Sequence, residues 1–166
     1  MALDFDLTED QILTRQAVRD FAEREIAPIA QELDDKEEFS VELTQKMAKI
    51  GLLGCCVPEK YGGAGMGYVS YIIAVEELAR IDGSQAATIA AANSLGVGPI
   101  YQYGDEEQKG EWLPKLCSGE MLAAFGLTEP EAGSDAGSSK TRAELRDGRW
   151  VINGRKIFIT NSACKL

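Results

Sequence analysis

Apolar residues recur every three to four positions through roughly the first 120 residues, the spacing of one helix face. The first helix is predicted to begin at Thr8, where Gln11 completes a capping box. Because Pro28 lacks a backbone N–H, we expect a kink or an end there, followed by a solvated acidic connection over residues 31–39. The predicted inner face consists of Leu13, Ala17, Val18, Phe21, Ala22 and Ile26.

Further helices are predicted between glycine and proline signals. One spans Val41–Ile50 and is capped by Gly51, and another spans Val69–Arg80. Ser84 is the expected N-cap of an alanine-rich helix. The side chains expected to face inward are Leu43, Met47, Ile50, Ile72, Ile73 and Ala79.

The last part of the helical region carries two more helix starts. Pro99 suits the first turn of a short helix that Gly104 ends. Asp105 and Gln108 form a second capping box, and the helix that follows is expected to be distorted at its internal proline and to stop near Gly119. The region therefore predicts a bundle of packed helices.

After Gly119 the apolar residues recur at every second position, the spacing of a β-strand, instead of every third or fourth. The dipeptides Asp147-Gly148 and Asn153-Gly154 separate short alternating segments, the strongest short-range signal for β-hairpins. The predicted strands are Lys140–Arg146, Arg149–Ile152 and Arg155–Thr160. The expected fold class is α+β: an N-terminal α-helical bundle domain (1–120), then the first antiparallel strands of a β domain (121–166) that stops before it could close.

Composition narrows the chemistry. The 166 residues have a formal net charge of −10 and show no basic stripe, so we expect no nucleic-acid partner and no anionic membrane partner. There is no histidine, which excludes Ser-His-Asp and Cys-His catalysis by this chain alone. The four cysteines have no CxxC spacing, so we expect reduced thiols and no metal site. Lacking a signal-like start or a long apolar run, the chain is expected to be cytoplasmic.

Two stretches of small residues are candidate ligand loops. Tyr61–Gly67 holds four glycines but matches neither GxGxxG nor a P-loop, so an ordinary turn is the favoured interpretation. Phe125–Asp135, FGLTEPEAGSD, follows an apolar run and could bring backbone N–H groups and hydroxyls close to a ligand. A surface loop between two strands is its plainer alternative.

FGLTEPEAGSD followed by GRKIFITN resembles the acyl-CoA dehydrogenase family, flavoenzymes that oxidise acyl-CoA thioesters to 2-enoyl-CoA. GLLGCCVPEKYGGAGM, VEELARIDGS and YGDEEQKGEWLPKLCSGE agree in order and spacing, so the resemblance covers nearly the whole chain. The short-chain, butyryl-CoA dehydrogenase-like members look nearest. The resemblance implies a helical domain, a middle β barrel and a C-terminal helical domain, the last absent here, with FAD as cofactor.

The resemblance also assigns residues. Thr128 is similar to a threonine at the isoalloxazine edge, Thr160 to one near flavin N5, and Phe158 to an aromatic that packs on the ring. Ser134 resembles a residue that touches the substrate's pantetheine arm. The expected cofactor-binding set is Phe125, Gly126, Leu127, Thr128, Gly133, Ser134, Phe158, Ile159 and Thr160. If residues 158–160 form a strand, Phe158 and Thr160 face the same side of it. The plainer alternatives are that Phe158 is an ordinary core aromatic and that Thr128 and Thr160 carry ordinary turn or sheet hydroxyls.

No residue matches the glutamate that serves as the family's catalytic base, and neither Glu129 nor Glu131 resembles it. Three hypotheses follow: the N-terminal part of an acyl-CoA dehydrogenase, inactive alone; a truncated, non-catalytic flavin- or acyl-CoA-binding module; or a helical interaction scaffold. The family further implies an acyl-CoA substrate, electron-transfer flavoprotein as electron acceptor, and a homo-oligomer, commonly a tetramer, in the complete enzyme.

Overall fold

The computed structural model describes residues 5–162. Helix α1 (Glu9–Phe21) begins as predicted, because the Thr8 hydroxyl accepts from the Gln11 N–H at 3.3 Å while the Gln11 side chain accepts from the Thr8 N–H at 3.1 Å. It runs on as a π-helical turn, η1 (Ala22–Ile26), and the regular helix ends before Pro28. The proline therefore marks a break, as its missing donor predicts.

Residues 31–39 contradict the expected connection, because Ala30–Lys36 forms helix α2. Its turns are tied by a bond from Gln31 Nε2 to Asp35 Oδ1 of 2.8 Å and by an ion pair between Lys36 and Glu32. Both pairs have the i,i+4 spacing that stabilises an isolated helix. The acidic composition correctly indicated exposure, since α2 has no buried residue, but it did not exclude helix.

The next segment alternates helix and tight turns. Helix α3 (Val41–Lys49) is capped by Ser40 and ended by Gly51, whose φ of 81° is the left-handed value that glycine adopts freely. Short 3₁₀ turns follow, η2 (Leu52–Gly54) and η3 (Glu59–Tyr61), and the glycine loop after them reaches helix α4 (Tyr68–Ala79).

Helix α5 (Gly83–Ala91) continues as a π-helical segment, η4 (Ala92–Val97), and then as α6 (Gly98–Tyr103). Its N-cap is Asp82 rather than Ser84, because the aspartate side chain accepts from the N–H groups of Ser84 and Gln85. Helix α7 (Glu106–Cys117) starts with the predicted capping box and contains the internal proline.

The helical core contains Leu53, Leu78, Ile89 and Leu113 among its most enclosed residues. Five predicted inward positions are wrong, because these residues lie at the surface: Leu13 (63% exposed), Ala17, Ile50 (41% exposed), Ile72 (58% exposed) and Ala79. In α4 it is instead Ile73, Ala74, Glu77 and Leu78 that are buried. The buried Glu77 carboxylate is neutralised by Arg19 (2.7 Å) and by Arg80 (2.9 Å), so α4 is held to α1 through a charged pair.

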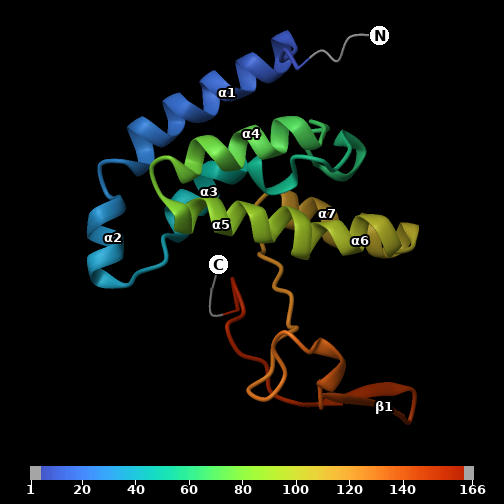
Figure 1. Ribbon diagram of the computed structural model, residues 1–166. Helices are drawn as coiled ribbons and strands as arrows, with labels where there is room; N and C mark the ends of the chain where they lie inside the picture. The colour runs from blue at the N-terminus through green and yellow to red at the C-terminus, as the bar shows by residue number, and fades with distance from the viewer. Residues whose placement is uncertain (1–4, 163–166) are drawn as a thin grey trace.

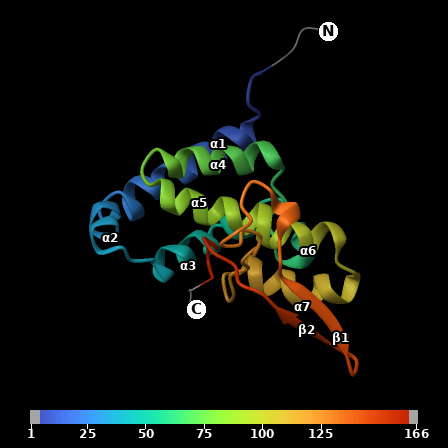
Figure 2. The same cartoon turned by 60° about the horizontal axis from the view of Figure 1, so that its bottom comes forward.

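Beyond α7 the chain crosses to a smaller layer that lies below the helices in Figure 1. After a 3₁₀ turn, η5 (Ala136–Ser138), strands β1 (Arg142–Arg146) and β2 (Arg149–Asn153) pair antiparallel, with Arg146 opposite Arg149. The predicted hairpin is confirmed: Asp147 (φ 49°) and Gly148 (φ 75°) make the two-residue turn. Figure 2 shows the hairpin projecting from the body. Helices followed by antiparallel strands confirm the predicted α+β class.

The third predicted strand is wrong. Residues 155–160 are not a strand, and Asn153-Gly154 does not turn a second hairpin. A strand needs a continuous ladder of partners. In the described part of the chain this segment makes one bond of that kind, from Ile157 N–H to Thr128 C=O at 2.9 Å. The sequence signals therefore predicted most of the helices and the first hairpin, but they missed α2 and predicted a third strand that does not form.

Candidate functional site

Three segments that are distant in sequence meet at one pocket of about 200 Å³. One is the end of α5 with η4, another is the apolar run after α7, and the last is the segment after β2. In Figure 1 this last segment returns from the hairpin toward α5. The lining residues are Ala91, Leu95, Ala123, Phe125, Leu127, Thr128, Phe158, Ile159 and Thr160.

A buried carboxylate, Glu129, holds two of these segments together. It is 6% exposed and accepts from the Lys140 N–H (2.6 Å), the Thr141 N–H (3.0 Å), the Thr141 hydroxyl and Lys156 Nζ (2.9 Å). Donors that favour the ionised form lower its pKa to about 2, with the Lys156 ammonium first among them and the Thr141 hydroxyl next. Such a group stays ionised at neutral pH and acts as a fixed anchor.

Lys156 extends this anchor to the pocket wall. Its Nζ also donates to the Leu127 carbonyl at 2.9 Å, beside the backbone bond from Ile157 to Thr128. At Gly126 an added Cβ would lie 3.2 Å from Lys156 Cγ, so a side chain there would crowd the lysine stem. The segment after α7 and the segment after β2 are thus fixed side by side, and the predicted cofactor-binding residues on both line the same pocket.

Phe158 lines the pocket from an unusual backbone position. Its φ is 57°, a left-handed value that is rare for an aromatic residue, and the residue is 90% exposed. Asn161 follows with a φ of 68°, and its Nδ2 donates to the Ala123 carbonyl at 3.3 Å. Phe158 and Thr160 do line the same pocket, but through this turn and not through the strand alternation that the sequence suggested.

The helical wall is set by Asn93. Its Oδ1 accepts from the Cys55 N–H at 2.8 Å, and its Nδ2 donates to the Leu52 and Ile89 carbonyls at 2.7 and 3.0 Å. These bonds join η4 to η2 through a buried side chain. In the sequence, Asn93 stands between Ala91 and Leu95, the two helical residues that line the pocket. The π-helical turn here is a feature that often marks functional sites.

The structure brings six of the nine predicted cofactor-binding residues to this pocket. Gly126 lies beside it, against Lys156. Gly133 and Ser134 do not line it; both are exposed in the loop before η5, and a Cβ at Gly133 would meet nothing within 4 Å.

Sequence reasoning missed several contributors: Asn93, Glu129, and the helical lining residues Ala91 and Leu95. The alanine-rich run before Asn93 signalled close packing, but not toward which neighbour. Glu129 was visible only as a carboxylate inside the motif, since its partners are eleven to twenty-seven residues away.

Residues 5–162 do not provide the side chains that several kinds of chemistry require. No group of three or more metal-ligating side chains is suitably placed, and no helix is long and apolar enough to cross a membrane. Glu129 is unsuited to be a general base, because its low pKa and its occupied oxygens disfavour proton uptake. What remains is a wall with two aromatic rings and two hydroxyls, which is suited to binding a flat ligand with polar edges.

Comparison with known proteins gives this wall a context. Residues 8–120 match the family model described as acyl-CoA dehydrogenase, N-terminal domain, and residues 124–165 match the acyl-CoA dehydrogenase middle domain. The short-chain specific acyl-CoA dehydrogenase of Clostridium acetobutylicum is 48% identical over 159 residues, covering 96% of this chain and 42% of that protein. The chain spans about two fifths of the length of the curated relatives it matches.

Solved structures agree. Butyryl-CoA dehydrogenase from Megasphaera elsdenii superposes with a TM-score of 0.92 at 44% identity, over 96% of this chain and 43% of that one. An acyl-CoA dehydrogenase from Bacillus anthracis, complexed with FAD, gives 0.89 at 41% identity, over 95% and 27%. A chain in a structure of the electron transferring flavoprotein of Acidaminococcus fermentans gives 0.94 at 44% identity, over 97% and 42%.

Proposed function

This chain belongs to the acyl-CoA dehydrogenase family, and on that premise we propose that it contributes one wall of the flavin site of an FAD-dependent acyl-CoA dehydrogenase. The proposed reaction is the oxidation of a short-chain acyl-CoA to its 2-enoyl-CoA. One observation carries the proposal: the pocket gathers six residues of the two motif segments against the end of α5. Relatives described as short-chain and butyryl-CoA dehydrogenases support the substrate class.

The residues of the wall fit a flavin. Phe158 presents an aromatic ring that is 90% exposed, and Phe125 (44% exposed) and Leu127 (46% exposed) line the same pocket. Burying such rings is favourable, so a flat heterocycle is a suitable cover. Thr128 and Thr160 line the same pocket and have hydroxyls that can donate to polar ring atoms.

When bound, FAD supplies the two-electron acceptor for the acyl chain. The chain's own residues would orient it: Phe158 by stacking, Thr128 and Thr160 by hydrogen bonds that stabilise developing negative charge on the ring. Backbone of 125–128 and the loop at Gly133 and Ser134 complete the proposed cofactor set, with Ser134 also toward the substrate. The proton from the α-carbon requires a base that we do not place among the described residues.

The proposed organisation is a helical domain over 1–120 and part of a middle β domain over 121–166. We assign the complete enzyme an acyl-CoA substrate, electron-transfer flavoprotein as electron acceptor, a homo-oligomeric assembly and a cytoplasmic location. A non-catalytic flavin- or acyl-CoA-binding module is the second candidate, because the one buried carboxylate of the site is unsuited to be a base. A helical scaffold is the third, and the pocket argues against it.

The test is reconstitution. The purified chain is incubated with FAD, freed of excess cofactor and scanned for flavin absorbance, and butyryl-CoA is then added. We expect retained flavin that butyryl-CoA does not bleach, because the base is not provided. Bleaching would show that the chain is catalytically complete and would overturn the assignment of the base elsewhere. A colourless preparation would argue for the scaffold.

A further inference from the structure

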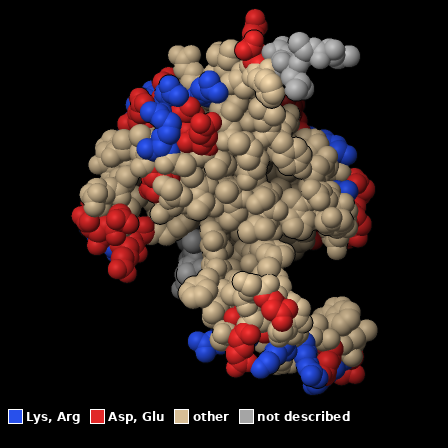
Figure 3. Space-filling model, in the orientation of Figure 1, with Lys and Arg blue, Asp and Glu red and all other residues tan. Residues whose placement is uncertain are grey.

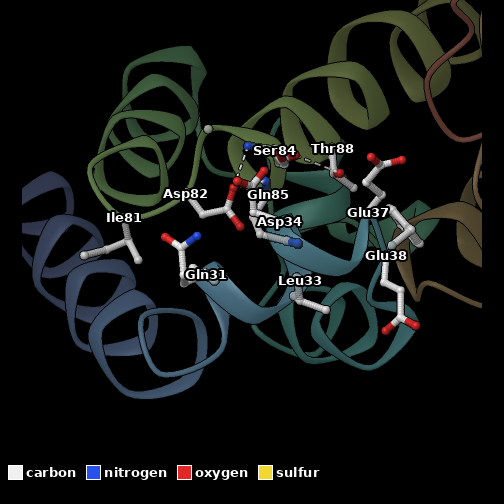
Figure 4. A pocket seen from close by; sticks show the side chains of 13 residues that line it. Gln31, Leu33, Asp34, Glu37, Glu38, Ile81, Asp82, Ser84, Gln85 and Thr88 are labelled. Atoms are coloured by element: carbon white, nitrogen blue, oxygen red, sulfur yellow. Dashed lines mark hydrogen bonds between the residues drawn. The ribbon is translucent and has the colours of Figure 1, made fainter.

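A second pocket, of about 730 Å³, lies at the start of α5, at the opposite end of this helix from the flavin wall, and is enclosed between α2 and the turn that joins α4 to α5. Figure 4 shows side chains of α2 and of the start of α5 converging on it, with Gln31 and Asp82 facing each other across the space. The pocket is open to solvent and is lined by both polar and apolar side chains. Its carboxylates are Asp34, Glu37, Glu38 and Asp82.

The charge of this pocket is not balanced from within. No lysine or arginine lines it, and none of its four carboxylates takes part in an ion pair among residues 5–162. The lysine of α2, Lys36, is engaged by Glu32 outside the pocket. Figure 3 shows acidic side chains gathered over α2. A positive ligand would therefore be attracted here.

A buried acceptor adds a second, independent observation. Gln85 is 4% exposed, lines the pocket, and its Oε1 has no hydrogen-bond partner in the described part of the chain. Figure 4 shows Gln85 at the start of α5, among the side chains that line the pocket. A buried acceptor without a donor is costly, and a ligand N–H that reached it would relieve that cost.

The walls indicate the shape of the ligand. Leu33 and Ile81 are partly buried apolar residues, and Phe39 is 40% exposed. Apolar walls suit the methylene stem of a long basic side chain, and an aromatic face attracts a guanidinium. A planar group with several N–H donors can satisfy an amide oxygen and a carboxylate together, which a single ammonium does less well.

We propose that this pocket binds an arginine side chain presented by a partner protein, with Gln85 Oε1 and the surrounding carboxylates as acceptors. The proposal is independent of the flavin site. The probe is N-acetyl-L-arginine amide, titrated into the chain by NMR while the Gln85 side-chain amide and the α2 backbone signals are followed. N-acetyl-L-citrulline amide is the neutral isostere and N-acetyl-L-lysine amide the ammonium control.

We expect saturable shifts with the arginine probe and affinity for the citrulline probe at least about tenfold weaker, the effect of one hydrogen bond to a charged group. Gln85→Met keeps the length of the side chain but removes the acceptor, and should weaken arginine binding about fivefold or more on the same scale. Asp34→Asn with Glu38→Gln should do likewise. Glu107→Gln with Glu111→Gln, the matched charge change on α7, should leave it unchanged.

Three outcomes would overturn the proposal. Absence of saturable shifts removes the site, and equal affinity for arginine and citrulline removes the role of charge. Tighter binding of spermidine than of the arginine probe would assign the pocket to a free polyamine. Circular dichroism of each variant distinguishes lost binding from lost folding, and the paired acid variants, which lie at exposed positions, keep the test valid if Gln85→Met is poorly folded.

Discussion

Replacing Asn93 by leucine should strongly destabilise the chain although the two side chains are similar in size. The amide lies where η4 meets η2 and is 9% exposed. Without it the N–H of Cys55, a fully buried residue, has no acceptor, and the Leu52 carbonyl keeps only the Cys55 thiol at 3.4 Å. The first loss costs about 1–3 kcal/mol and the second about 1 kcal/mol, so we expect about 2–4 kcal/mol in all.

The assay is equilibrium unfolding in urea followed by circular dichroism. With a slope of about 2 kcal/mol per molar urea, the midpoint should fall by about 1–2 M. Ser94→Ala is the control, because that hydroxyl makes an exposed bond to the Ala90 carbonyl; it should shift the free energy of unfolding by no more than about 0.5 kcal/mol. If Asn93→Leu were as stable as the control, the Asn93 bridge would not support the helical wall.

Three further predictions concern other parts of the chain. The pKa of Glu129 is about 2 in the folded chain against an ordinary value of 4.5, so the stability that its carboxylate adds is present above pH 4.5 and is lost toward pH 2. The difference in free energy of unfolding between wild type and Glu129→Gln, measured in urea, should therefore shrink to near zero between pH 4.5 and pH 2. A difference that stayed constant over this range would contradict the role of Glu129 as an anchor. Gly54→Ala should lower the melting temperature, because its Cβ would lie 2.4 Å from the Cys117 sulfur. Gly110→Ala, in open space on α7, should instead raise the melting temperature, since alanine adds about 0.5–1 kcal/mol to the free energy of unfolding of a helix. If Gly54→Ala were the more stable variant, the close packing of Gly54 against Cys117 would be refuted. Burial raises the pKa of Cys55 to about 12 and of Cys117 to about 11, so peptide mapping should find both alkylated by iodoacetamide only after unfolding, and rapid native labelling would show that they are accessible.

Local signals in the sequence were reliable at helix caps and tight turns, but not for α2, whose stabilising i,i+4 pairs are also local. Both capping boxes, the Gly51 cap and the Asp147-Gly148 hairpin each depend on residues within a few positions of one another, and all are confirmed. The N-cap at Asp82 was missed by two positions, because a serine and an aspartate compete for the same role. Such errors are small and have a local cause.

Long-range contacts were not predictable in the same way. The segment 155–160 has strand-like alternation, yet its conformation is set by Lys156 reaching Glu129 and by the left-handed Phe158. Ile72 fits the helical period of α4, yet the buried face is set by Glu77 pairing with Arg19 fifty-eight residues earlier. The pocket residues were named through the family motifs, and their meeting at one wall could only be seen in three dimensions.

The central claim is that Phe158 and its neighbours form a flavin-binding wall, and the most direct measurement is an NMR titration of the chain with FAD. We predict intermolecular NOEs from the isoalloxazine protons to the Phe158 ring and the Thr160 methyl, and none to Trp150, an aromatic residue of β2 that is 67% exposed and lies outside the pocket. NOEs to Trp150 with none to Phe158, or no shift of any pocket residue at saturating FAD, would contradict the claim.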